Sequence, residues 1–195
     1  MTIEIEVRPG VPAAQKEAAV RLYCLAFEQK LRPFLGSPER TTRFLVPGLM
    51  EDRIICAIAG GRVVGVAGFK RAGRGMFEPG LAAFFREYGI TAPFRLAALL
   101  LMERMERPGE LLMDGIAVAP EMRGQGIGGL LLDAIEDHAR RHGEKSIRLD
   151  VIDTNPGAKK LYERNGFKGV RSRGTGLLSP FFAFTSTLQM RKLLD

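Results

Sequence analysis

The stretch from Asp114 to Gly129 constrains the fold more than any other part of the chain, because a strand pattern passes into a helix pattern across a glycine-rich turn. The apolar run ends at Ala119, Pro120 turns the chain, and Arg123-Gly-Gln-Gly-Ile-Gly-Gly opens the helix. The first N–H groups of a helix have no internal partner, and the helix dipole favours negative charge there. Glycines let an anion approach the backbone closely and allow positive φ. The segment therefore predicts a phosphate-binding loop, with a pyrophosphate as its natural ligand.

The same glycines also match the dinucleotide-binding fingerprint, as Gly124-x-Gly126-x-x-Gly129 with Asp150 at a strand end about 20 residues later. Three features oppose that interpretation. Four residues separate the strand from the first glycine, 123 residues precede that glycine, and 66 residues follow Gly129. Those 66 residues are too few to complete a doubly wound sheet from this unit. We therefore favour a different phosphate-binding fold.

A second segment, residues 150–167, reads as a strand, then Asn155, then a helix that stops at Gly166. Its helix has the pattern Ala-x-x-Leu-Tyr-x-x-x-Gly-Phe. Together with the Arg-x-x-Gly-x-Gly loop, in this order and spacing, it resembles the two motifs of the GCN5-related N-acetyltransferase (GNAT) superfamily. The resemblance is specific over residues 113–167 and looser over the rest of the chain.

The resemblance implies how a cofactor would be held. In that family the glycine loop holds the pyrophosphate of acetyl-CoA, and the preceding strand offers main-chain groups to the pantetheine arm. Asn155 would contact the cofactor or orient the strand end, and it also reads as a helix cap before Pro156; both roles can hold together. The implied cofactor-binding residues are Ile116, Ala117, Val118, Arg123, Gly124, Gln125, Gly126, Ile127, Gly128, Gly129 and Asn155.

Two residues are candidates for the chemistry. Tyr162 matches the family's tyrosine, which is expected to donate a proton to the departing thiolate; the alternative is a half-buried core tyrosine. Asp114 stands where many relatives place an acid on this strand, and period-two alternation predicts that it shares a face with Ile116 and Val118. Apolar neighbours would raise its pKa and suit it to act as the base, directly or through water. The alternative is a carboxylate satisfied by a backbone donor or an arginine.

The remaining patterns, with the resemblance, predict a single α/β domain over residues 1–195, with a GNAT-like mixed, mostly antiparallel central sheet flanked by helices. A tight hairpin is expected at Gly60-Gly61. Strands are expected over residues 3–7, 53–59, 62–70, 110–119, 146–152, 167–173 and 182–190. Helices are expected over residues 13–35, 38–45, 81–88, 93–107, 126–141 and 156–165.

The segment Arg71 to Pro108 departs from the family pattern, because relatives commonly join the flanking strands by a short turn. It predicts a helical insertion before the cofactor-binding strand, and the helix over 93–107 is apolar around most of its circumference. Two interpretations stay open. The insertion is a lid that favours an apolar or aromatic acceptor, or it is a subunit interface of a homodimer.

Composition narrows the classes of partner. The net charge of +7 is dispersed, and no basic run with interleaved aromatics predicts nucleic-acid binding. The longest apolar run, Leu96 to Met102, is too short for a membrane span, and the N-terminus lacks a targeting pattern, so we expect a cytoplasmic protein. Cys24 and Cys56 read as reduced core thiols. His138 and His142 read as part of a solvated helix face, and no metal is expected.

These observations predict an N-acetyltransferase that moves an acetyl group from acetyl-CoA to a primary amine of a small molecule or peptide, by direct attack on the thioester. The alternative is a non-catalytic acyl-CoA-binding sensor on the same fold. The identity of the acceptor is not encoded in any pattern of the chain.

Overall fold

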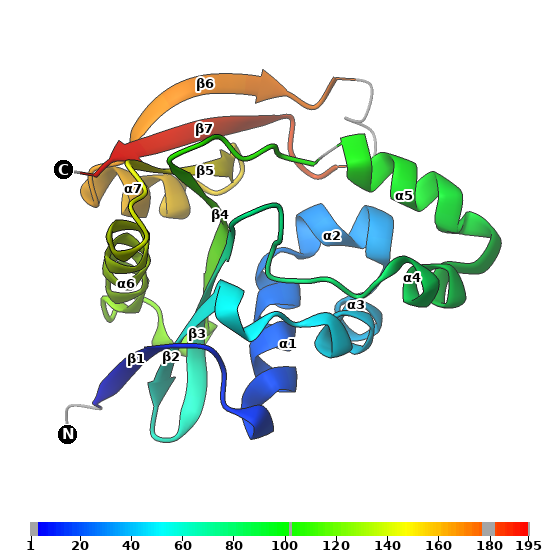
Figure 1. Cartoon of the computed structure of the whole chain (residues 1–195), viewed down its shortest axis with the longest axis horizontal. Coiled ribbons are helices and arrows are strands. Elements are labelled where there is room, and N and C mark those ends of the chain that lie inside the picture. The colour runs from blue at the N-terminus through cyan, green and yellow to red at the C-terminus, as the bar shows by residue number, and fades with distance from the viewer. Residues whose placement is uncertain (1–3, 102, 177–181, 195) are drawn as a thin grey trace.

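The structure is a computed structural model that describes residues 4–101, 103–176 and 182–194. Across these residues the chain forms a seven-stranded sheet with the order β1-β2-β3-β4-β5-β7-β6 (Figure 1). Strands β4 and β5 run parallel, and all other neighbours in this sheet are antiparallel. The strands are β1 Ile5–Pro9, β2 Ile54–Ala59, β3 Arg62–Lys70, β4 Glu110–Val118, β5 Ser146–Ile152, β6 Lys168–Gly174 and β7 Ser186–Leu193.

Helices cover both faces of the sheet (Figure 1). Helices α6 and α7 pack on one face, α1 packs on the other, and α2 to α5 lie beyond α1 on its side. The helices are α1 Lys16–Ala26, α2 Glu28–Leu35, α3 Pro38–Leu45, α4 Leu81–Tyr88, α5 Ala92–Leu101, α6 Ile127–Arg141 and α7 Pro156–Arg164. This confirms the predicted α/β class, the mostly antiparallel sheet and the helical insertion before β4.

Local sequence signals explain several elements directly. In α6, Ile127, Leu131 and Ile135 recur at i, i+4 and i+8 and are at most 1% exposed against the sheet. Burying each of these side chains stabilises the fold by about 1.5–3 kcal/mol. The hairpin between β2 and β3 turns at Gly60 and Gly61, which have φ of 54° and 74° as the sequence predicts.

Strands β4 and β5 separate along their length, and this separation creates the site. They pair from Glu110 opposite Ser146 to Leu112 opposite Arg148. Beyond that point β4 continues to Val118 beside β3, whereas β5 continues beside β7. A wedge therefore opens between the carboxyl-terminal halves of two parallel strands.

A β-bulge in β4 changes the direction of its side chains. Gly68 pairs with Gly115 but Phe69 pairs with Met113, so Asp114 is the extra residue. Met113 packs in the core cluster beneath α6, and Ile116 packs against that same cluster. The prediction that Asp114 shares a face with Ile116 and Val118 is therefore wrong, because the bulge interrupts the alternation of two.

The helix expected over residues 13–35 is broken at Phe27, which has φ −107° and ψ 19° between α1 and α2. Its ring stacks near Tyr23, with the ring centroids 4.4 Å apart. It also covers Gly115, where an added Cβ would lie 2.2 Å from the ring. The break thus turns an aromatic ring onto the bulge of β4.

Helix α5 of the insertion ends at Leu101, so the expected extension to Arg107 is wrong. Leu96 and Leu99 pack against the helical core cluster, whereas Phe94 and Leu100 are 80% and 63% exposed. Helix α5 therefore packs one part of its apolar surface inside the chain and exposes another part that includes Phe94 and Leu100. Whether the exposed face is a lid or a homodimer interface stays a prediction.

Candidate active site

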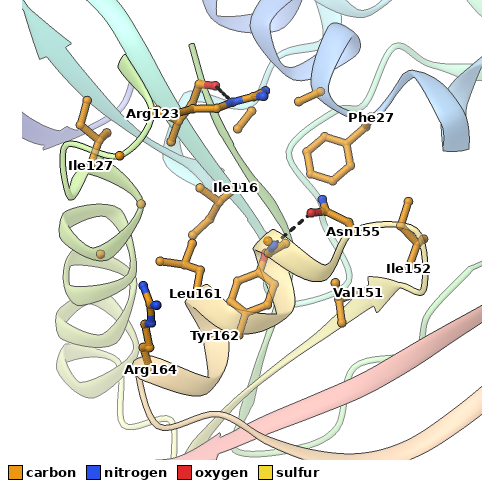
Figure 2. Close-up of a pocket in the computed structure, with 18 of the residues that line it drawn as sticks. Phe27, Ile116, Arg123, Ile127, Val151, Ile152, Asn155, Leu161, Tyr162 and Arg164 are labelled. Atoms are coloured by element: carbon orange, nitrogen blue, oxygen red, sulfur yellow. Dashed lines mark hydrogen bonds between the residues drawn. The ribbon is translucent and has the colours of Figure 1, made fainter. Parts of the chain in front are cut away.

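A cavity of about 670 Å³ occupies the wedge between β4 and β5 (Figure 2). Helix α6 contributes its first turn, α7 contributes one side, and the break between α1 and α2 contributes Phe27. One continuous space therefore joins a helix N-terminus, a strand edge and the side chain of Tyr162. The predicted residues that line it are Ile116, Ala117, Val118, Arg123, Gly124, Gly126, Ile127, Gly128, Gly129, Asn155 and Tyr162.

One end of the cavity is built for an anion. Gly124 and Gly126 have φ of 78° and 80°, and Gly126 is the left-handed N-cap of α6. A Cβ added at either glycine would meet no atom within 4 Å, so the space beside the backbone is open. The first N–H groups of α6 and the positive end of its dipole face this space. These features fit the pyrophosphate of a coenzyme A molecule.

The glycines of the loop have different roles, which the sequence pattern alone treats alike. Gly128 is helical, and a Cβ there would lie 2.9 Å from the Leu161 side chain, so its small size lets α6 approach α7. Gly129 is also helical, but its Cβ would enter open space. Gln125 is absent from the cavity wall; its side-chain amide donates to the Glu121 carbonyl over 3.5 Å.

Main-chain groups of β4 face the wedge. Ile116, Ala117 and Val118 line the cavity beyond the last β4–β5 pair, where β5 no longer covers this edge of the strand. An edge without a neighbouring strand offers N–H and C=O groups to an extended ligand. Arg123 reaches back to donate from Nε to the Val118 carbonyl over 3.3 Å, which places its guanidinium beside the loop.

Asn155 combines the two roles that its position predicts. Its Oδ1 accepts a hydrogen bond from the Ala158 N–H over 3.0 Å and so caps α7, with Pro156 at the first helical position. The same residue lines the cavity beside Phe27 (Figure 2). The cap uses the oxygen, which leaves the side-chain nitrogen as a donor toward a ligand.

Tyr162 of α7 lines the cavity although it is only 5% exposed. Burial raises its pKa to about 12, and the nearby Arg104 guanidinium opposes that rise. The phenol therefore keeps its proton at neutral pH. Its position between Leu161 and the end of β5 holds the ring in one place (Figure 2).

Asp114 is held away from the cavity. Its Oδ1 lies 3.1 Å from Arg104 Nη2, and its Oδ2 accepts from the Met76 N–H over 3.5 Å. Burial raises the pKa of this carboxyl, as its apolar surroundings predicted, while Arg104 and the Met76 N–H oppose the rise. The cavity wall does not include Asp114. The arginine and backbone partners match the alternative interpretation, and its role as the base stays a prediction.

Comparison with known proteins gives the family. The model of the acetyltransferase (GNAT) family matches residues 19–167, about three quarters of the chain. The chain belongs to the GNAT family of acetyltransferases. Among solved structures, this GNAT chain is similar to YncA, a putative acetyltransferase from Salmonella typhimurium solved with acetyl-CoA, with a TM-score of 0.63 and 17% identity over 98% of this chain and 94% of that one.

Sequence relatives match shorter segments of this GNAT chain. An uncharacterized N-acetyltransferase of Bacillus subtilis, YhfO, is 37% identical over 57 residues, which are 29% of this chain and 38% of the relative. The acetyltransferase Atu2258 of Agrobacterium fabrum is 39% identical over 66 residues, 34% of this chain and 47% of the relative. The matched segments thus span less than half of either relative.

The GNAT site contains charged residues that the sequence motifs did not predict. Lys30 of α2, Asp150 of β5 and Arg164 of α7 line the cavity, and Arg104 of the insertion reaches Asp150. Burial, with the Arg104 charge acting in the same direction, lowers the pKa of Lys30 to about 8, whereas Asp150 and Asp114 oppose that shift. These residues lie far apart in sequence, so no local pattern joins them.

Across residues 4–101, 103–176 and 182–194, no three or more His, Cys, Asp and Glu side chains gather as they would around a metal ion. Within the same residues, none of the helices combines the length and apolar character that crossing a membrane requires.

Proposed function

We propose that this chain transfers an acetyl group from acetyl-CoA to a primary amine of a small molecule or peptide, by direct attack of the amine on the thioester. The observation that carries this proposal is that a single cavity joins the anion-binding end of α6 to the phenol of Tyr162. A coenzyme A seated with its pyrophosphate on the α6 loop and its pantetheine along β4 would direct its sulfur toward that phenol.

In this reaction the amine nitrogen bonds to the thioester carbonyl carbon, and the carbon–sulfur bond breaks. Tyr162, whose phenol is protonated at neutral pH, supplies a proton to the departing thiolate. Main-chain groups of residues 116–118 would hold the pantetheine arm, and Arg123 with the glycine loop would hold the phosphates.

Thiol release from acetyl-CoA in the presence of a panel of primary amines is the direct test. An acetyltransferase releases free thiol with at least one amine and forms the matching amide. An acyl-CoA-binding sensor would bind acetyl-CoA, measured by calorimetry, and release no thiol with any of them. That second outcome would replace the proposed transfer by a binding function.

The phosphate end is tested at Gly129 rather than at Gly126. Gly126 has φ of 80°, so any side chain there strains the backbone, whereas Gly129 is helical with open space at its Cβ. Gly129→Leu should weaken acetyl-CoA binding at least about tenfold, because the side chain takes the space of a phosphate. Asp133→Leu, at an exposed position of the same helix, is the matched control and should bind normally. Equal affinity in both variants would contradict the placement of the pyrophosphate.

A further inference from the structure

The end of the insertion, residues 103–107, is fastened to the sheet although it has no helix or strand of its own. Arg148 of β5 donates to the Met105 carbonyl over 2.5 Å. Glu106 accepts from the Gly73 N–H over 2.7 Å. Both contacts lie directly after Arg104 and hold that part of the chain in place, which restricts where the Arg104 guanidinium can reach.

Arg104 spans the wedge where β4 and β5 part. Its Nη2 lies 3.1 Å from Asp114 Oδ1 on β4, and its Nη1 lies 3.5 Å from Asp150 Oδ2 on β5. Its Nη1 also donates to the Met113 carbonyl over 3.1 Å. Beyond the last β4–β5 backbone pair, this side chain joins the two strands by charged contacts.

The two carboxylates joined by Arg104 differ in what they face. Asp150 lines the cavity that Tyr162 also lines, and the contact with Arg104 involves its Oδ2, which leaves Oδ1 for a ligand. Asp114 is turned to Arg104 and the Met76 N–H and does not line the cavity. Lys30 of α2 faces the same group of charges, and burial and Arg104 both lower its pKa.

The geometry points to Asp150 as the carboxylate that binds the acceptor's ammonium group and takes its proton, with Arg104 of the insertion as the residue that positions Asp150. This inference rests on the proposed acetyl transfer and names the residues of its acceptor side. The inference gives the insertion a residue in the active centre, in addition to any surface that its helices α4 and α5 cover.

The protons balance as follows. The acceptor enters as R–NH3⁺ and gives one proton to Asp150, which becomes a carboxylic acid, and the nitrogen gains the lone pair that attack requires. As the carbon–nitrogen bond forms and the carbon–sulfur bond breaks, the sulfur takes the phenolic proton of Tyr162. The second proton leaving the nitrogen restores the phenol, and Asp150 releases its proton to water.

The first test compares the two carboxylates, each with its charge removed by a nearly isosteric change. Asp150→Asn should lower kcat/KM for the acceptor about 10²- to 10³-fold, with the dissociation constant for acetyl-CoA unchanged. Asp114→Asn should cost less than Asp150→Asn, because its carboxylate does not face the cavity. Full activity of Asp150→Asn, or a greater loss in Asp114→Asn, overturns the assignment.

The second test concerns Arg104. Arg104→Met should lower kcat for the acceptor about 10- to 100-fold while the KM for acetyl-CoA stays constant, because Asp150 loses its orientation. Arg104→Lys keeps the charge without the two-armed fork and should recover part of that loss. Glu103 neighbours Arg104 in the chain and pairs with Lys70 of β3. Glu103→Gln, which removes the charge of that ion pair alone, is the control and should be fully active.

The outcomes separate this inference from the proposed function. If the wild-type chain acetylates an amine but Arg104→Met and Asp150→Asn match it within about twofold, the inference fails alone. If the wild-type chain acetylates no amine, the proposed function fails and the inference falls with it. Should Arg104→Met not fold, Arg104→Lys and Asp150→Asn, which keep the size of the side chain, decide the matter.

Discussion

The phenol of Tyr162 carries its proton throughout the pH range in which acetyl transfer would be assayed, because burial raises its pKa to about 12. We predict that Tyr162→Phe, which removes only the hydroxyl, lowers kcat about 10²- to 10⁴-fold and leaves the dissociation constant for acetyl-CoA unchanged. Single-turnover thiol release with calorimetric binding measures both quantities. Near-full turnover in Tyr162→Phe would show that water or another group protonates the thiolate.

The charged neighbours of His138 in the sequence suggested a solvated helix face. In the structure its ring instead packs on Phe69, with the ring centroids 4.5 Å apart. Burial, followed by the facing His142, lowers its pKa from 6.5 to about 4; Arg71, Arg141 and Arg53 act in the same direction. Between pH 6.5 and pH 4 the unfolded chain therefore binds more protons at this site than the folded chain. Linkage requires that the free energy of unfolding falls as pH falls through this window.

Replacing His138 should change how steeply the free energy of unfolding depends on pH. His138→Leu removes the titrating group, so the loss of stability between pH 6.5 and pH 4 should be smaller than in the wild type. Urea denaturation at pH 7, 5.5 and 4.5 measures it, and the free energy of unfolding of the wild type minus that of His138→Leu should decrease as the pH falls. If the free energies of unfolding of the two proteins changed in parallel over the whole pH range, His138 would not titrate in this window.

At the scale of elements, the bulge in β4 and the break between α1 and α2 depend on each other. Gly115 has φ of 147°, and a Cβ there would lie 2.2 Å from the Phe27 ring. We predict that Gly115→Ala lowers the free energy of unfolding by about 2–4 kcal/mol, from backbone strain and overpacking together. In a Phe27→Ala background, Gly115→Ala should lower the free energy of unfolding by less, because the ring that would be overpacked is gone and only the backbone strain remains.

A double-mutant cycle on Gly115→Ala and Phe27→Ala, measured by urea denaturation, isolates that coupling. The expected coupling energy is at least about 1 kcal/mol, since the two residues are in contact. Additive effects would mean that the ring moves aside without cost. Because Phe27 lines the cavity, the same variants report whether acetyl-CoA binding depends on the break.

Elements that depend on local signals were predicted from the sequence, and those that depend on distant partners were not. Strand β5 and helix α6 follow from apolar periodicity and flanking glycines, so their bounds are within a residue of the prediction. The bulge at Asp114 arises from pairing with β3, and the break at Phe27 arises from the space above Gly115. Neither partner lies near the residue concerned in the sequence.

At the scale of the whole molecule, the same contrast divides the candidate site. The phosphate end is continuous in sequence, from Arg123 to Gly129, and all of its predicted residues except Gln125 line the cavity. At the proposed acceptor end, Lys30 and Asp150 line the cavity and Arg104 contacts Asp150, and these three residues come from distant segments. Only the three-dimensional fold brings those charges together, so motif spacing could point to the loop residues of the cavity but not to these.

The two ends depend on a buried ion pair at the root of the wedge. Glu110 Oε1 and Arg148 Nε lie 2.5 Å apart, with the side chains 2% and 6% exposed, and Arg191 lies 3.4 Å from the second carboxylate oxygen. Arg148 also holds the Met105 carbonyl beside Arg104. The Arg148 side chain therefore links the last β4–β5 backbone pairs to the end of the insertion, residues 103–107.

This arrangement predicts two separable effects of Arg148→Met. The free energy of unfolding should fall by about 3 kcal/mol, because the buried Glu110 carboxylate loses its closest partner and keeps only the half-exposed Arg191. Adding Glu110→Leu should recover most of that stability, since the charge is gone. Turnover should not recover in the double variant, because the Met105 carbonyl remains without its donor and Arg104 is no longer aimed at Asp150. Urea denaturation and acceptor kinetics on both variants test this, and a double variant that regains full turnover would show that the ion pair serves stability alone.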